Sequence, residues 1–399
     1  MTREPIRLAL VMDHPAQQFA QALRLLAGDP EVRLGVHYWS VAEGIYDAGF
    51  DRQVSWDIDL LGGYKWAAAP DTRFVIRRAR WLVGRLRAMR PQVVVCYGWA
   101  SPIARITIIY CLLTRTRLLL YGDTTWQHSS RGRRPVFRSV ALRVLTHLCA
   151  GAVSTGTFNR EFYIRYGMDP RHIWPGVCPA DTETFGDAGP DGAEPSSCSD
   201  RPLRIGFAGK LIARKGADEL LHAAALLPAP FDYSVTVVGD GPLMPELRVL
   251  AARLGLDDRV TFHGFANTTE MPKLLRSFDV VVVPSRLDMR ALVTIEAMAA
   301  GAAVVVSDAT AVWGPGDLVE HEVTGMVYPS GDPRALSREL GRLIADRPFL
   351  TKLRCSGAER AAGYGPDAFA RTMASAAWMA ASATPDAQCQ FRARATTGP

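Results

Sequence analysis

Short apolar runs alternate with longer amphipathic segments through the first half of the chain. This pattern predicts strands at Ile6–Met12, Val32–Trp39, Val93–Cys96, Leu118–Tyr121 and Ala152–Ser154. Between most of them it predicts helices at Ala16–Ala27, Phe74–Met89, Pro102–Leu113 and Val136–Cys149. Strands that alternate with helices in this way are typical of an open parallel sheet covered on both faces.

The same pattern restarts in the second half. Strands are expected at Leu203–Phe207, Ser234–Val238, Val260–Phe262, Val280–Val283 and Ala303–Ser307. Helices are expected at Asp218–Leu227, Met244–Leu254, Met271–Phe278, Leu292–Ala299 and Pro333–Ile344. The sequence therefore predicts an α/β protein with two doubly wound, Rossmann-like domains. Ligands of such sheets bind at the carboxyl ends of the strands, so we expect a cleft there.

Changes in composition suggest the domain limits. We expect an N-terminal domain at residues 1–176, a linker rich in Pro, Gly and Ser at 177–202, and a C-terminal domain at 203–362. A last helix within 363–383 is expected to pack back on the first domain, and the polar tail 384–399 to be disordered. Residues Tyr46–Ala69 break the alternation and suggest a long functional loop.

Composition narrows the class of protein. With 399 residues, 48% of them hydrophobic and 22% charged, the chain resembles folded soluble proteins of two domains. The net charge of +6 fits either an ordinary arginine-rich surface or attraction to an anionic ligand or membrane. Seven scattered cysteines without a C-x-x-C pair indicate neither a zinc site nor a disulfide framework. No nucleic-acid-binding motif is present.

The short length of the apolar segments suggests where in the cell the protein is found. Ile6–Met12 is a strand-length run rather than a signal peptide, and Ile106–Thr114 is too short to span a bilayer, so a cytoplasmic protein is expected. The segment Arg77–Arg90 is basic and amphipathic. It is either a solvated helix face or a surface that docks on an anionic membrane or acceptor.

A basic, glycine-bounded loop follows the first strand of the second half. It reads G-K-L-I-A-R-K-G and contains Gly209, Lys210 and Lys215. Glycine lets a ligand approach the backbone, and both ammonium groups can reach the same strand end, so phosphate binding is predicted. The spacing is not that of a P-loop, and a solvated basic turn is the alternative.

The next two strands end in further glycine-containing turns. The sequence V-G-D-G-P contains Gly239, which indicates either a tight turn or a surface for a flat nucleotide or sugar. In His263-Gly264-Phe265, the backbone at Gly264 can hydrogen-bond a base edge, and Phe265 either lies against a ring or packs in the core.

Two acids flank a predicted helix start in the segment S-R-L-D-M-R-A-L-V-T-I-E-A-M-A-A-G. Asp288 precedes the helix, which is expected to open near Leu292, and Glu296 follows Asp288 by eight positions. Amide groups at a helix start attract phosphate, and carboxylates hold sugar hydroxyls. Together they suggest a nucleotide-sugar site. The alternative for Asp288 alone is a helix cap or a solvated loop acid.

These motifs as a set resemble glycosyltransferase family 4, which comprises retaining nucleotide-sugar enzymes of the GT-B fold. The resemblance covers nearly all of the second domain. It implies that Lys210 and Lys215 neutralise the donor diphosphate and that Glu296 accepts hydrogen bonds from the ribose hydroxyls. It also implies that the backbone amides of Leu292 and Val293 meet the phosphate or the sugar.

The chain departs from the family pattern beside the sugar pocket. Asp288 stands where the family usually has Glu, which normally contacts the transferred sugar, and its side chain is shorter by one methylene. The usual aromatic–glycine pair is Arg290-Ala291 here. Arg290 adds a cation near the sugar, so the resemblance implies an unusual sugar more than a different reaction.

The first domain resembles a subgroup that has an H-P-x-Q segment and a W-D-x-x-L-L-x-G-Y loop. His14 lies in the first of these and either touches the acceptor or the donor phosphates or makes a helix contact. Asp57 and Asp59, in the second, invite a metal interpretation, but in a GT-B enzyme the lysines and the helix start neutralise the diphosphate, so no metal cofactor is expected.

Further candidates follow other strands of the first domain. The resemblance implies that Asp123 orients the acceptor, the alternative being an ordinary turn residue. Trp99 and Trp126 suit a sugar face, although core packing explains them equally well.

The implied activity is retaining transfer of a sugar from a UDP- or GDP-linked donor to an acceptor hydroxyl. The acceptor is a small molecule or lipid-linked, in natural-product, glycolipid or surface-polysaccharide biosynthesis. The alternatives are a nucleotide-sugar epimerase, a phosphorylase-like GT-B enzyme, and a non-catalytic nucleotide-sugar-binding protein. A Rossmann dehydrogenase is disfavoured because no G-x-G-x-x-G follows either opening strand.

Overall fold

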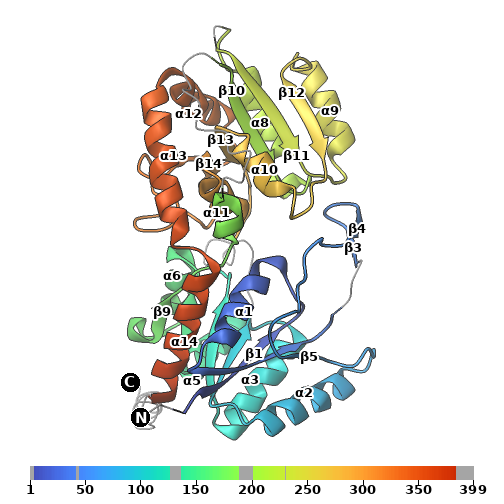
Figure 1. The fold of residues 1–399 in the computed structure, drawn as a ribbon, viewed down its shortest axis with the longest axis vertical. Coiled ribbons are helices and arrows are strands. Elements are labelled where there is room, and N and C mark those ends of the chain that lie inside the picture. The colour runs from blue at the N-terminus through green and yellow to red at the C-terminus, as the bar shows by residue number, and fades with distance from the viewer. Residues whose placement is uncertain (1–3, 42–44, 126–135, 188–200, 230, 383–399) are drawn as a thin grey trace. The chain divides into compact units, whose positions relative to one another are not determined.

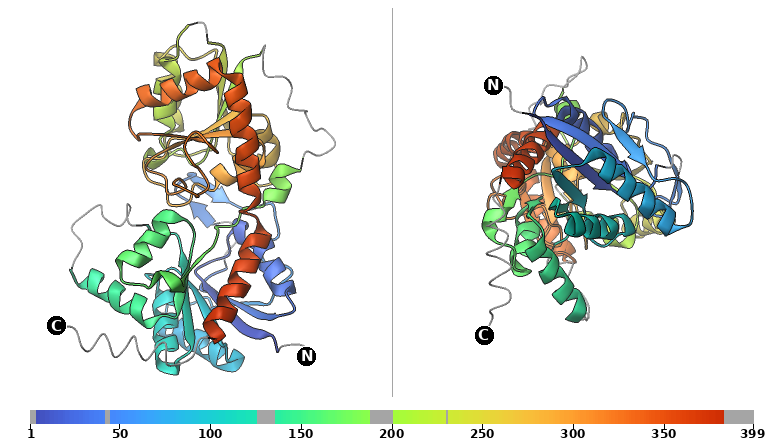
Figure 2. Two further views of the ribbon diagram at one scale, coloured as in Figure 1. Left: turned by 90° about the vertical axis from the view of Figure 1, so that its left-hand side faces the viewer. Right: turned by 90° about the horizontal axis from the view of Figure 1, so that it is seen from below.

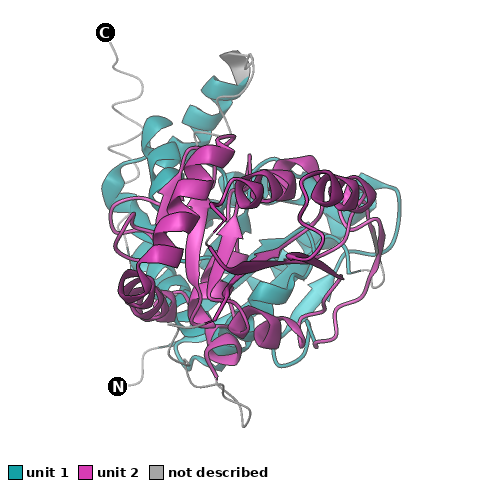
Figure 3. Ribbon diagram, turned by 90° about the horizontal axis from the view of Figure 1, so that it is seen from above, with its two compact units in different colours: residues 1–42, 59–179, 366–399 teal, residues 43–58, 180–365 magenta. Residues whose placement is uncertain are grey.

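The computed structural model describes residues 4–41, 45–125, 136–187, 201–229 and 231–382 (Figure 1). The chain forms two compact units. Unit 1 comprises residues 1–42, 59–179 and 366–399, and unit 2 comprises residues 43–58 and 180–365 (Figure 3). A short segment of the first half of the sequence, residues 43–58, is thus part of the unit formed mainly by the second half.

Unit 1 is built on a parallel sheet with the strand order β5-β2-β1-β6-β7-β8-β9. The order reverses between β1 and β6, which makes this the switch point of the sheet. The strands are β1 (Ile6–Met12), β2 (Val32–Tyr38), β5 (Trp66–Ala68), β6 (Val93–Tyr97), β7 (Arg117–Gly122), β8 (Gly151–Ser154) and β9 (Ile173–Pro175).

Helices cover both faces of this sheet because successive strand residues point to opposite sides. Leu8 and Leu10 pack with α1 (Ala20–Gly28) and α14 (Pro366–Ser382), which lie together on one face (Figure 2). Ala9 and Val11 face the opposite layer. That layer contains α2 (Val75–Met89), α3 (Pro102–Thr114), α5 (Val136–Leu148) and α6 (Thr157–Arg165), and the unit also has the short helices η1 (Gln17–Phe19) and η2 (Pro170–His172).

Helix α14, from the end of the sequence, completes the core of unit 1. Phe369 packs edge-on against Phe19 and Tyr121, with ring centroids 5.6 and 5.5 Å apart. Such aromatic contacts stabilise a core beyond the apolar area that they bury. Among the described helices, none has both the length and the apolar composition needed to cross a membrane.

Unit 2 has a second parallel sheet with the order β12-β11-β10-β13-β14-β15. Its switch point lies between β10 and β13, where ligands of doubly wound sheets bind. The strands are β10 (Leu203–Ala208), β11 (Tyr233–Val238), β12 (Val260–Gly264), β13 (Val280–Val283), β14 (Ala303–Ser307) and β15 (Met326–Tyr328). The predicted fold class of two doubly wound α/β domains is confirmed.

The second sheet is also buried on both faces. Val280 and Val282 point to one side and Val281 and Val283 to the other. The helices of the first side are α8 (Ala217–Ala225), α9 (Met244–Arg253) and α12 (Pro333–Ala345), and those of the second are α7 (Thr182–Gly186), α10 (Met271–Arg276) and α11 (Val293–Ala299). Helix α13 (Arg347–Ala362) contributes to both layers, and η3 (Ala213–Lys215) lies in the loop after β10.

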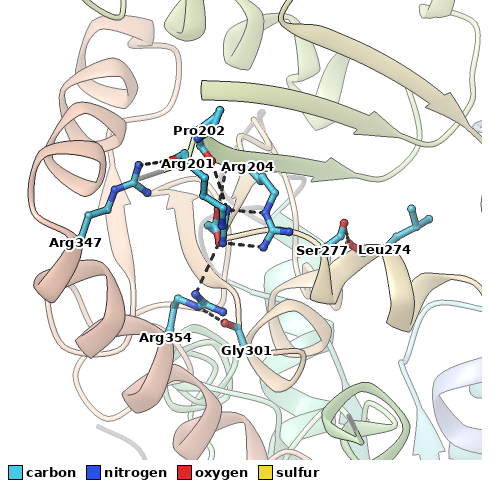
Figure 4. Close-up of polar contacts among 9 residues, drawn as sticks. Arg201, Pro202, Arg204, Leu274, Ser277, Gly301, Arg347 and Arg354 are labelled. Atoms are coloured by element: carbon cyan, nitrogen blue, oxygen red, sulfur yellow. Dashed lines mark hydrogen bonds and ion pairs between the residues drawn. The ribbon is translucent and has the colours of Figure 1, made fainter. Parts of the chain in front are cut away.

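A buried carboxylate ties the amino-terminal edge of this sheet together (Figure 4). Asp279, at the start of β13, is fully buried and accepts hydrogen bonds from Arg201 Nη1 and Nη2 at 2.6 and 2.7 Å. It also accepts from the Arg204 backbone at 2.9 Å, and Arg354 Nη1 lies 3.8 Å away. Burial opposes ionisation, but the hydrogen bonds from Arg201 and Arg204 outweigh it and lower the pKa of Asp279 to about 2.

The structure corrects several sequence predictions. Residues Tyr46–Ala69 are not one long loop, because they contain the antiparallel hairpin β3 (Ile45–Asp47) and β4 (Arg52–Val54) and the edge strand β5. Strands of three residues are too short to produce a recognisable period. Helix α13 was not predicted. It buries Gly357 and Ala361 as well as leucines, so its buried positions do not form a clear periodic pattern of large apolar residues. Helix α7 forms inside the expected linker, whereas 188–200 and the tail 384–399 lie outside the described residues.

Candidate functional site

Lys215 and Asp288 meet at the switch point of unit 2. Lys215 ends η3 in the loop after β10, and Asp288 lies in the loop after β13. The two loops approach closely because Gly216, with φ of 70°, lies against Pro284; a Cβ there would be 2.0 Å from the Pro284 carbonyl oxygen. Lys215 Nζ donates to Asp288 Oδ2 at 2.5 Å. The sequence singled out both residues, and the structure brings them together.

Hydrogen bonds hold the Asp288 carboxylate in place. Asp288 is only 7% exposed, and its Oδ1 accepts from the backbone amides of Ala291 and Arg290 at 3.0 and 3.3 Å. Ser285 Oγ donates to Oδ2 at 3.4 Å. Burial opposes the charge, but Lys215 and the two amides outweigh it and lower the pKa of Asp288. Asp288 therefore caps the turn before α11 and holds the Lys215 ammonium.

The residues between Asp288 and α11 adopt an unusual conformation. Ala291 is buried and has φ of 38°, a region that residues with a Cβ rarely adopt. Burial lowers the pKa of the neighbouring Arg290 to about 10. The Arg290-Ala291 pair, which the sequence identified as a departure from the family pattern, thus coincides with a strained turn at the switch point.

Helix α11 carries Glu296 in its first turn. The helix begins at Val293 with Leu292 as N-cap, as the sequence predicted. Burial raises the pKa of Glu296 to about 7, and the Asp181 carboxylate adds to this shift. Asp181 was not identified from the sequence, because it lies in the segment interpreted as a linker. Glu296 is poised to change its charge near neutral pH.

Lys210 lies in the same loop as Lys215, before η3 in the sequence. It follows Gly209, whose carbonyl oxygen would be 1.9 Å from a Cβ on Gly239, so the turns after β10 and β11 touch through glycine. Lys210 Nζ donates to Asp47 Oδ2 at 2.6 Å and lies 4.9 Å from the centroid of the Phe50 ring. Neither hairpin residue was predicted, since nothing in the sequence links positions 163 residues apart.

Phe265 follows β12, which ends at Gly264 with φ of 88°. The Phe50 ring packs edge-on against it with centroids 5.2 Å apart, and the Arg52 guanidinium lies 4.5 Å from its centroid. Phe265 is thus covered by β3–β4 side chains, which the sequence did not predict.

The candidates of unit 1 follow the carboxyl ends of its central strands. His14 is exposed after β1, and Asp123 is half-buried after β7. Trp99 follows β6, with the Arg138 guanidinium 5.1 Å from its ring. His14 and Trp99 thus lie at the switch point of this sheet. Trp126 lies outside the described residues.

Asp57 and Asp59 each make hydrogen bonds within their own unit. Asp57 belongs to unit 2, where its carboxylate accepts from the Thr269 backbone at 3.3 Å. Asp59 belongs to unit 1 and accepts from the amides of Leu61 and Gly62 at 2.9 Å. Across the part of the chain that the structure describes, no three His, Cys, Asp or Glu side chains gather as metal ligands would.

The second half of the chain matches a known family model. The family described as "Glycosyl transferases group 1" matches residues 202–346, which include both lysines, Asp288 and Glu296. The similarity to this family is therefore confined to residues 202–346.

Two bacterial glycosyltransferases are similar to part of the chain. The D-inositol 3-phosphate glycosyltransferase of Salinispora tropica is 36% identical over 213 residues, which cover 48% of this chain and 43% of that protein. The alpha-D-kanosaminyltransferase of Streptomyces kanamyceticus is 33% identical over 148 residues, 37% of each chain. The aligned region thus spans less than half the length of either relative.

Solved structures resemble the whole fold. The crystal structure of Anabaena HepE in complex with UDP has a TM-score of 0.71 at 18% identity, over 93% of this chain and 99% of that one. The lipopolysaccharide outer core galactosyltransferase WaaB, in its apo form, gives 0.70 at 14% identity, over 94% and 99%. At such identities the likeness shows the fold alone, which is that of GT-B glycosyltransferases.

Proposed function

We propose that this protein is a retaining glycosyltransferase and that unit 2 binds its nucleotide diphosphate-sugar donor, linked to UDP or GDP. The observation that carries the proposal is the meeting of Lys215 with Asp288 at the switch point, in the loop that leads to α11 with Glu296 in its first turn. The glycosyl transferases group 1 match of the same stretch and the glycosyltransferase names of the relatives support it.

The chemistry of the site suits an anionic ligand. The diphosphate brings about two negative charges, and an ammonium–phosphate contact contributes roughly 1 kcal/mol in water to about 4 kcal/mol near a protein surface. Lys210 and Lys215 come from one loop and are both partly buried, with side-chain exposures of 29% and 19%, so their charges are less screened than those of surface lysines. Glu296 would accept hydrogen bonds from the ribose hydroxyls, and the amides of Leu292 and Val293 would approach the phosphate or sugar.

The proposed reaction needs no enzymic nucleophile. The bond from the anomeric carbon to the phosphate oxygen breaks as the acceptor oxygen bonds to the same face, and the departing phosphate oxygen takes the acceptor proton. Catalysis then consists of positioning and of stabilising the leaving diphosphate through the lysines, without a metal. Asp288 and Arg290 would border the transferred sugar and select it.

The acceptor would be offered by unit 1. His14, Asp123 and Trp99 follow neighbouring strands there and provide polar groups and an aromatic face. The name of the D-inositol 3-phosphate glycosyltransferase points to a small polyol phosphate as acceptor. A lipid-linked acceptor remains the alternative, because the arginine-rich helix α2 begins at the exposed side chains Phe74, Val75 and Ile76.

The proposal is tested by screening UDP- and GDP-sugars by thermal shift and then measuring nucleotide release with a panel of acceptors. A donor that binds the native state raises the melting temperature. We expect transfer with retained anomeric configuration, visible by NMR of the product, and unchanged in the presence of EDTA. Sugar isomerisation without an acceptor would instead identify an epimerase. The absence of any nucleotide-sugar binding would contradict the proposal.

A further inference from the structure

The hairpin segment, residues 45–58, contacts the loops that follow β10, β11 and β12 of unit 2. Its first contact is Asp47 with Lys210, after β10. Next, the carbonyl oxygen of Gly49 would be 2.8 Å from a Cβ on Gly241, in the loop after β11. Farther along, Asn267 Nδ2, after β12, donates to the Ser55 carbonyl at 3.0 Å.

The part of the hairpin segment from Phe50 onward is anchored by packing and hydrogen bonds. Phe50 and Arg52 both cover the Phe265 ring. The Asp57 carboxylate accepts from both the backbone amide and the hydroxyl of Thr269. These contacts hold the segment over the carboxyl edge of the sheet without involving a lysine.

The amino-terminal end of the hairpin segment holds Lys210 through the carboxylate of Asp47. Asp47 Oδ2 lies 2.6 Å from Lys210 Nζ, while Oδ1 accepts from the Gly49 backbone at 2.8 Å. Burial opposes ionisation, but Lys210 and the hairpin amides outweigh it and lower the pKa of Asp47, so this group is charged at neutral pH. Both side chains are about one-third exposed, at 34% and 29%, which leaves the pair open to exchange with a solute.

We infer that Asp47 competes with the donor diphosphate for Lys210, so that the hairpin segment sets donor affinity. The inference rests on the proposed function, in which Lys210 binds the diphosphate. A carboxylate oxygen at 2.6 Å from an ammonium occupies the position of a phosphate oxygen. Two anions that share one ammonium repel each other, so the donor must displace Asp47 or bind against its charge.

The opposite role for Asp47 predicts an opposite change in nucleotide affinity when its charge is removed. If Asp47 held Lys210 ready for the diphosphate, removing its charge would weaken nucleotide binding. If Asp47 competes, removing its charge strengthens binding, and only for ligands that carry phosphate. Asp47→Asn is suited to this question because the amide oxygen can still accept from the Gly49 backbone and keep the turn.

The experiment measures UDP, GDP and the corresponding nucleosides by calorimetry on the full chain. For Asp47→Asn we expect UDP or GDP to bind about five- to tenfold more tightly at low salt, corresponding to the loss of one near-surface charge contact. Nucleoside affinity should not change, and the gain should shrink as added salt screens the site. Asp57→Asn is the matched control, because it removes the same charge from the same segment but contacts Thr269 rather than Lys210.

The outcomes separate the two hypotheses. Weaker or unchanged diphosphate binding by Asp47→Asn, or an equal gain in Asp57→Asn, overturns the inference while leaving the proposed function intact. A folded wild-type chain that binds neither UDP nor GDP rejects the proposed function and the inference with it. Circular dichroism checks folding, and Asp47→Ser, which keeps a short acceptor for the turn, replaces Asp47→Asn if that variant fails to fold.

Discussion

Lys215 Nζ and Asp288 Oδ2 lie 2.5 Å apart although 73 residues separate them in the sequence. Loops after two different strands bring them together at the point where the strand order of unit 2 reverses. The pair therefore has two roles that experiments can separate. It links two loops of the fold, and in the proposed function its ammonium faces the donor phosphates.

Replacing one member of this pair should affect stability and activity differently from replacing both. Lys215→Met leaves the Asp288 charge buried without its partner, so we expect a loss of about 1–3 kcal/mol in the free energy of unfolding and loss of most turnover. The double variant Lys215→Met/Asp288→Asn should regain most of the stability but not the turnover. Denaturant unfolding and nucleotide-release assays measure both quantities. A Lys215→Met variant with near-normal turnover would contradict the assigned role.

Glu296 should make donor binding depend on pH. Its pKa of about 7 means that only the ionised fraction can accept hydrogen bonds from both ribose hydroxyls, so UDP or GDP affinity should rise between about pH 6 and 8. Calorimetry in buffers of different ionisation enthalpy should show proton release on binding. Glu296→Gln should bind more weakly and lose this pH dependence; a pH dependence that persists would assign it to another group.

Glu296 should also cost stability at high pH. Because burial raises its pKa from the ordinary value of 4.5 to about 7, its favourable contribution is present below about pH 4.5 and is lost as the pH rises through 7. Glu296→Gln should therefore raise the free energy of unfolding at pH 8 by about 1–2 kcal/mol and change it little at pH 5. Equal effects at both pH values would contradict this explanation.

Asp279 should dominate the response of unit 2 to acid. Its pKa of about 2 lies below the ordinary value of 3.8, so its stabilisation is present above about pH 4 and is lost as the pH falls towards 2. At pH 7, Asp279→Asn should cost about 3–5 kcal/mol, because the arginines around it lose their buried partner. Asp367→Asn is the control: its pair with Arg371 is exposed, and its removal should cost under about 1 kcal/mol.

Ala291 offers a stabilising substitution. Its φ of 38° costs a residue with a Cβ about 1–2 kcal/mol, whereas glycine adopts this region freely. Ala291→Gly should therefore raise the melting temperature by a few degrees, after allowing for the greater chain entropy of unfolded glycine. Ala297→Gly, a matched change inside α11, should lower it instead. A lower melting temperature for Ala291→Gly would show that the turn is not strained.

The sequence predicted the parallel sheets well, because runs such as Val280–Val283 are buried on both faces and stand out from their neighbours. It also placed Lys215 and Asp288 at strand ends that parallel topology brings together. It could not predict Asp47, Phe50 or Asp181, whose positions depend on long-range contacts that no local pattern encodes. The hairpin β3–β4 escaped notice because three-residue strands carry no detectable period.

The order in which the chain contributes to the two units limits where it can be cut or recombined. Residues 43–58 belong with the later part of the sequence, and α14 belongs with the earlier part. A protease cut or a gene chimera joined at the proline-rich stretch near residue 190 would leave one piece without Phe369 and the other without Asp47. Swapping halves between homologues at that point would therefore mismatch both a core helix and the cover of Lys210, so functional hybrids should require four coordinated crossover points rather than one.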